Sequence, residues 1–169
     1  MRGLLRCGLL GLAAVELGLG AWTALFPASF YADVPTVDLT PPYSEHLMRD
    51  FGGATLGLAL VLAAAALRPD RRSSVVALLA YLAFSLPHLV FHAGHLHGAT
   101  PVEAAALVAL LGASVAGPLA LLAVALLGLP PDRPAARAGG PWAPGTGEPD
   151  AGGHPALRGA GPGALSRHR

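Results

Sequence analysis

Four histidines lie within ten residues near the middle of the chain, at His88, His92, His95 and His97. The i,i+4 spacing of His88 and His92 lets two imidazoles on one face of a helix share a metal ion. His95 continues this face, whereas His97 points the other way. Imidazole is the commonest protein ligand for zinc, copper and iron, and an added carboxylate would suit zinc or non-haem iron. The candidate metal ligands are therefore His88, His92 and Asp50.

Other polar residues of neighbouring segments are expected to join these histidines in one cluster near the outer face of a membrane. The predicted members are Glu16, Glu45, His46, Arg49, Asp50, His88, His92 and His95. The favoured hypothesis is a non-catalytic cluster that is structural or binds a small ligand. The alternative is a redox enzyme that holds a transition metal or haem through His88, His92 and a carboxylate, and proton-linked or quinone-linked roles are also open.

No catalytic nucleophile can be assigned from the pattern. Ser85 shares a helix face with His88. A serine on a packed membrane helix usually bonds its own backbone, however, and we expect Ser85 to do so.

The elements that carry these residues are apolar enough for lipid. Of 169 residues, 53% are hydrophobic and 12% are charged, whereas soluble domains carry about 25% charged residues. Helices are predicted at about 4–26, 45–67, 74–95 and 101–129, each long enough for a core that needs about 20 residues. The expected fold is an all-α bundle of four transmembrane helices in a lipid bilayer, followed by a disordered, cytoplasmic Gly/Pro/Ala-rich tail over 130–169.

The ends of these helices carry recognisable signals. Ser44 and Thr100 are predicted N-caps, and Glu103 lies in the first turn after Thr100. The region between 27 and 43 is predicted to be a loop. A cleaved signal peptide would also begin with arginines and an apolar stretch, but Glu16 interrupts that stretch, so we expect a retained helix.

Arginines indicate how the helices cross the membrane. They flank alternate crossings, at Arg2, Arg6, Arg68, Arg71, Arg72, Arg133 and Arg137. The positive-inside rule then places both termini in the cytoplasm and the histidines toward the outer face of a plasma membrane. The net charge of +1 argues against a nucleic-acid partner.

Depth in the membrane decides which polar groups can meet. At about 1.5 Å per residue, Glu16, Asp50, His88 and His92 are expected to share one layer of the outer leaflet. A charge near the membrane centre costs at least about 2.5 kcal/mol. Glu16 should therefore face the bundle, with Arg49 or His88 as its partner.

Small residues mark a predicted helix–helix contact. Gly53 and Gly57 form a G-x-x-x-G motif, and Gly52 adds a further small residue. Such faces let backbones approach closely. We expect this face to meet another helix, either within the chain or in a homo-oligomer or membrane-complex partner.

Glu16, the run PPYSEHLMRDFGGATLGLAL over 41–60 and the run LPHLVFHAGHLHG over 86–98 together carry a family resemblance. With the four predicted helices, they make the chain similar to the DoxX-like family of small bacterial four-helix integral membrane proteins. The resemblance covers about residues 4–129. Some DoxX-like proteins are associated with quinol oxidation or thiosulfate metabolism, which implies at most a redox-adjacent role and assigns no site residue.

Overall fold

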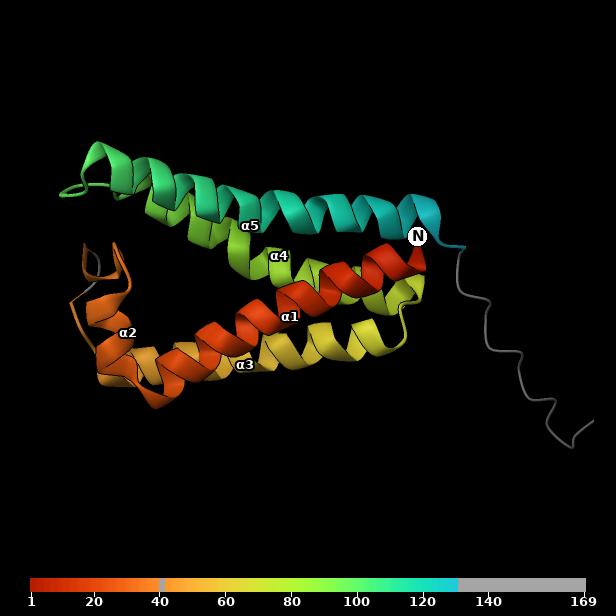
Figure 1. The fold of residues 1–169 in the computed structure, drawn as a ribbon, viewed down its shortest axis with the longest axis horizontal. Helices are drawn as coiled ribbons and strands as arrows, with labels where there is room; N and C mark the ends of the chain where they lie inside the picture. Colours follow the sequence, from red (N-terminus) through yellow and green to blue (C-terminus); the bar gives the residue numbers. More distant parts are fainter. Residues whose placement is uncertain (40–41, 131–169) are drawn as a thin grey trace, which may run out of the picture. The chain divides into compact units, whose positions relative to one another are not determined.

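The computed structural model describes residues 1–39 and 42–130. Its four long helices are α1 (Arg2–Leu25), α3 (Glu45–Leu67), α4 (Arg71–Gly94) and α5 (Pro101–Gly128) (Figure 1). All four are long and apolar enough to cross a membrane. Within these residues there is no strand, so the predicted all-α fold of four spans is confirmed. The predicted tail lies outside the described residues, apart from Pro130.

The connection between α1 and α3 differs from the predicted loop, because it contains the short helix α2 (Pro27–Asp33) and the 3-10 turn η1 (Val37–Leu39). Pro27 stands at the start of α2, where its fixed φ angle favours a helix and its missing N–H is not needed. Phe30 is buried, and its ring meets Trp22 of α1 edge-on with centroids 5.5 Å apart. This aromatic contact anchors α2 to the end of α1.

Side-chain caps fix where the later helices begin. Ser44 caps α3, and Thr100 forms a capping box with Glu103 at the start of α5, as predicted. The start of α4 lies earlier than expected from the serines at 73 and 74, because Asp70 is its cap. The Ser73 N–H donates to Asp70 Oδ1 at 2.8 Å, and this bond holds the pKa of the Asp70 carboxyl below its usual range.

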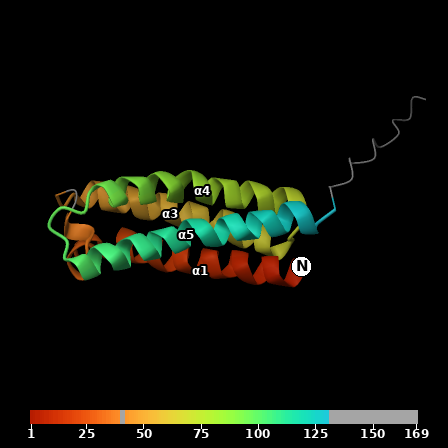
Figure 2. The same ribbon diagram turned by 90° about the horizontal axis from the view of Figure 1, so that it is seen from above.

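The four helices associate as two closely packed pairs, α1 with α3 and α4 with α5 (Figures 1 and 2). The first pair crosses at two glycines. A Cβ added to Gly52 would lie 2.6 Å from the Ala24 nitrogen, and one added to Gly20 would lie 2.9 Å from the Leu56 nitrogen. Only glycine permits this approach of backbones.

The predicted G-x-x-x-G motif does not mediate this crossing. A Cβ added to Gly53 or Gly57 would meet nothing within 4 Å. Gly52, which the motif does not include, faces α1 instead. Successive residues of a helix point about 100° apart, so a shift of one position moves a side chain to a different face.

The apolar core joins the two pairs near the N-terminal end of α1. Its largest fully buried side chains include Leu5, Leu9, Leu62 and Leu78, one or more from each of α1, α3 and α4. Large hydrophobic side chains also cover the outer surface, with Leu60 71% exposed and Leu127 87% exposed. An apolar surface of this extent fits a lipid environment.

Candidate functional site

The histidine face of α4 forms a row of rings that starts next to α3. The His88 ring stacks on Phe84, with centroids 5.3 Å apart and planes inclined by 24°. Phe51 of α3 covers the same region at 6.4 Å from His88. The His92 ring then meets His88 edge-on at 4.5 Å. Both imidazoles are partly buried, and within the described residues neither forms a hydrogen bond or an ion pair.

His95 is tied to its own helix. Its ring stacks on Phe91 at 4.1 Å, and Nδ1 lies 2.7 Å from the Phe91 carbonyl oxygen. Because a carbonyl oxygen only accepts, Nδ1 must carry the proton of this bond. His95 is thereby a C-terminal cap of α4 that satisfies a carbonyl left free at the helix end.

The charged start of α3 forms a second, separate group. His46 Nε2 lies 3.3 Å from Asp50 Oδ2, and both side chains are mostly exposed. Arg49 lies 2.9 Å from Glu45 and also donates from Nη1 to the Ala24 carbonyl oxygen at 2.6 Å. The charged start of α3 is therefore paired internally, His46 with Asp50 and Arg49 with Glu45. Arg49 also donates a hydrogen bond to the end of α1.

The structure does not complete the metal site proposed from the sequence. Over residues 1–39 and 42–130, no three His, Cys, Asp or Glu side chains gather closely enough to hold a metal ion. Asp50 pairs with His46 rather than joining His88 and His92. The reason is rotational: Phe51 takes the position of α3 that faces His88, which turns Asp50 about 100° away.

Glu16 belongs to a third location, inside the bundle. It is only 3% exposed, and it lies beside the Tyr81 side chain of α4, which is also buried. Ser114 of α5 lies next to Tyr81 and donates to the Leu111 carbonyl oxygen at 2.7 Å. No hydrogen bond or ion pair joins Glu16 to Arg49 or His88 in the described chain, so the structure does not support either expected partner. Tyr81 precedes His88 by about 10 Å along α4, which separates Glu16 from the predicted outer layer.

Three buried polar atoms in this interior have no hydrogen-bond partner among the described residues: Glu16 Oε2, Ser74 Oγ and Ser85 Oγ. The expectation that Ser85 bonds its own backbone is therefore wrong. Ser114 was not anticipated as part of a site. Its signal was present, because it is the one hydroxyl-bearing residue in the otherwise apolar stretch from Ala104 to Gly128.

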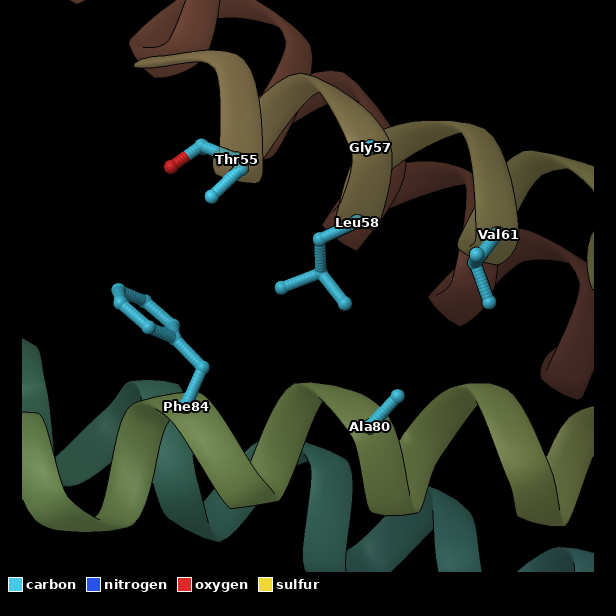
Figure 3. Close-up of a pocket in the computed structure, with 7 residues that line it drawn as sticks. Thr55, Gly57, Leu58, Val61, Ala80 and Phe84 are labelled. Carbon is cyan, nitrogen blue, oxygen red and sulfur yellow. The ribbon is translucent and has the colours of Figure 1, made fainter. Parts of the chain in front are cut away.

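A pocket of about 290 Å³ lies between α3 and α4 (Figure 3). Its lining consists of Ala54, Thr55, Gly57, Leu58, Val61, Ala80 and Phe84. The Thr55 hydroxyl donates to the Phe51 carbonyl oxygen at 2.8 Å, so even the polar side chain of this lining is bonded to its own helix. Phe84 belongs both to the pocket wall and to the ring stack on His88.

Fold and site together define a helical protein with four membrane-spanning segments, an apolar pocket between α3 and α4 and a pair of imidazoles beside it. Compared with known proteins, the chain matches no family model, no curated protein and no solved structure. Function must therefore be argued from the geometry of this chain alone.

Proposed function

We propose that this protein is an accessory, non-catalytic component of the plasma membrane that binds a small amphipathic molecule between α3 and α4. The apolar part of the ligand occupies the pocket, and its polar group bonds to His88 or His92. One observation carries this proposal: Phe84 lines the pocket and also stacks on His88, so an apolar cavity and an imidazole share one wall.

The chemistry of the pocket limits the ligand. Burial of apolar surface supplies roughly 25 cal/mol per Å², which favours an aliphatic or aromatic body. The volume of about 290 Å³ fits a small ring system or a short chain rather than a whole phospholipid. The two imidazoles supply both donors and acceptors, and such bonds are stronger in a medium of low dielectric constant.

Arginine placement supports an orientation for this site. Both termini and the turn with Arg68, Arg71 and Arg72 are proposed to be cytoplasmic, which turns the histidine end of α4 outward. The ligand would then enter from the outer leaflet. Membership of the DoxX-like family also remains a proposal, supported by the four-helix arrangement and by the sequence runs that carry the resemblance.

Two glycines offer a matched test of ligand binding. Gly57 lines the pocket and Gly53 does not, and a Cβ at either would meet nothing within 4 Å. Gly57→Leu should therefore fill the pocket, whereas Gly53→Leu should leave it open. We expect organic extracts of the detergent-purified protein to contain a small molecule in about equimolar amount in Gly53→Leu and to lack it in Gly57→Leu. Equal amounts in the two variants, or ordinary lipid alone in both, would contradict the proposal.

The metal or haem alternative is favoured by the 4.5 Å separation of the His88 and His92 rings. Metal analysis and a visible spectrum of the same preparations distinguish it. A stoichiometric metal or haem that persists in Gly57→Leu and disappears in the double variant His88→Ala, His92→Ala would replace the pocket proposal. In that case an external ligand would have to complete the coordination, since Asp50 does not.

A further inference from the structure

One face of α4 is polar along most of the length of the helix. Residues that follow one another at alternating steps of four and three lie within an arc of about 100° on a helix. From the start of α4 to its C-cap, such residues form the polar face of α4, which consists of Ser74, Leu78, Tyr81, Ser85, His88, His92 and His95. All except Leu78 carry a hydroxyl or an imidazole. Polar side chains are costly inside a membrane span, so a continuous row of them points to a function.

The polar face opens toward its histidine end. Ser85 is 2% exposed, His88 and His92 are half-buried, and His95 is exposed. The packing of the helices changes in the same direction. Of the described residues, none in 86–94 of α4 or in 101–114 of α5 is buried, whereas the leucine-rich core encloses Leu78. The polar face is therefore loosely covered from His95 to Ser85 and closed at Leu78.

Buried oxygen atoms at the inner end of this stretch need hydrogen-bond partners. Ser85 Oγ has none among the described residues, and Glu16 Oε2 of α1 has none either. Glu16 is 3% exposed, so bulk solvent does not satisfy its carboxyl group. Ordered water usually bonds to buried polar atoms of this kind, and each such water bonds to about three groups.

Glu16 lies near the inner end of the open stretch. Ala13, one turn before Glu16 on the buried face of α1, belongs to the same buried cluster as Tyr81. Tyr81 precedes Ser85 by about one turn of α4. Of the titratable side chains on α1, α3 and α5, only Glu16 is buried in the described part of the chain. It is therefore the one titratable group that the neighbouring spans place inside the bundle at this level.

The chemistry of the polar face selects what it binds. Hydroxyl and neutral imidazole groups both donate and accept hydrogen bonds, so they can bond to water in either orientation. A metal ion would need ligands that converge, and over residues 1–39 and 42–130 no three His, Cys, Asp or Glu side chains do so. Imidazole and carboxyl groups also exchange protons with water. Water and the protons that it carries therefore fit this face best.

We propose that the polar face of α4 is a water-filled path that leads from His95 down to Ser85. The leucine-rich core closes this path at Leu78, so water and its protons reach Glu16 from one side of the membrane only. The path does not depend on a ligand between α3 and α4, nor on the direction in which the chain crosses the membrane.

Cysteine labelling tests whether water reaches Ser85. Two variants in a Cys7→Ser background are compared, Ser85→Cys and the matched control Leu86→Cys, whose position is adjacent in depth but 51% exposed on the apolar surface. Charged methanethiosulfonate reagents attack the thiolate, and a thiolate forms readily only where water is present. Both variants should react fully after unfolding in SDS.

The folded variants are then labelled in liposomes, with the reagent on both sides of the membrane. We expect Ser85→Cys to react at least about tenfold faster than Leu86→Cys, although Ser85 is the more buried position. Equal rates, or no reaction of Ser85→Cys, would overturn the proposal.

Water-edited solid-state NMR tests the same path in the wild-type protein. Magnetisation should pass quickly from water to the side chains of Ser85 and Glu16, and slowly to the methyl groups of Leu78. Transfer to Ser85 or to Glu16 that is as slow as transfer to Leu78 would contradict the path. Fast transfer to all three would contradict its closure at the leucine-rich core.

Discussion

Arg49 is the residue that connects the beginning of α3 with the end of α1. Its guanidinium donates to the Ala24 carbonyl oxygen at 2.6 Å and pairs with Glu45 at 2.9 Å. The carbonyl groups of the last turn of a helix have no partners within that helix. Arg49 supplies one for α1 and also places a positive charge at the negative end of its dipole.

We predict that Arg49→Met lowers the free energy of unfolding by about 1 kcal/mol, since it removes a charge-assisted hydrogen bond at a half-exposed site. Glu45→Gln removes only the exposed ion pair and should cost less than about 0.5 kcal/mol. Thermal unfolding in detergent measures both. If Glu45→Gln proved as destabilising as Arg49→Met, the ion pair and not the cap of α1 would be the important contact.

The burial of Glu16 could be predicted from the sequence, but its partner could not. A lone carboxylate in an apolar span must turn inward, whatever the detailed packing. The choice between Arg49, His88 and Tyr81 depends on the relative height of two helices, and one residue of shift is about 1.5 Å. Depth in the membrane, estimated from the number of residues to the helix ends, predicts that Glu16 lies level with His88. In the structure Glu16 lies level with Tyr81.

At the scale of the elements, the existence of the four spans followed from hydropathy and length, and the caps at Ser44 and Thr100 followed from residue type. The faces that pack could not be predicted in the same way. Gly52 and Gly53 are adjacent and chemically identical, yet only Gly52 lies against α1. In spans that are apolar on every side, the hydrophobic pattern no longer distinguishes the inner face from the outer one.

The crossing of α1 and α3 can be tested with these adjacent glycines. A Cβ at Gly52 would lie 2.6 Å from the Ala24 nitrogen and 2.9 Å from its Cα, and backbone atoms cannot move aside cheaply. We predict that Gly52→Ala costs about 1–3 kcal/mol of stability. Gly53→Ala meets nothing and should gain up to about 1 kcal/mol from helix propensity. Similar thermal midpoints for the two variants would show that α1 and α3 do not approach as closely as described.

At the scale of the whole molecule, tight packing and polar chemistry occupy different parts of the described helices. The leucine-rich core joins α1, α3 and α4 near the N-terminal end of α1. Glu16 and Tyr81 follow farther along the helices, and His88 and His92 lie beyond them. Glu16 and Tyr81 are therefore enclosed by protein at about the level of the pocket, whose lining includes Ala80 and Phe84 on either side of Tyr81. His88 and His92 lie nearer the proposed outer face, where a ligand in the outer leaflet can reach them.

The orientation of the chain in the membrane decides from which leaflet a ligand can reach His88 and His92. Reporter fusions can test this orientation. Alkaline phosphatase is active outside the cytoplasm, so we predict activity for fusions after Leu39 and after Gly98. A fusion after Ser74, which retains Arg68, Arg71 and Arg72, should be inactive if the proposed orientation, with this turn in the cytoplasm, is correct. Replacing the three arginines with alanine should weaken that preference and raise the activity of the Ser74 fusion. The opposite pattern would turn His88 and His92 toward the cytoplasm, and a ligand would then have to reach the pocket from the inner leaflet.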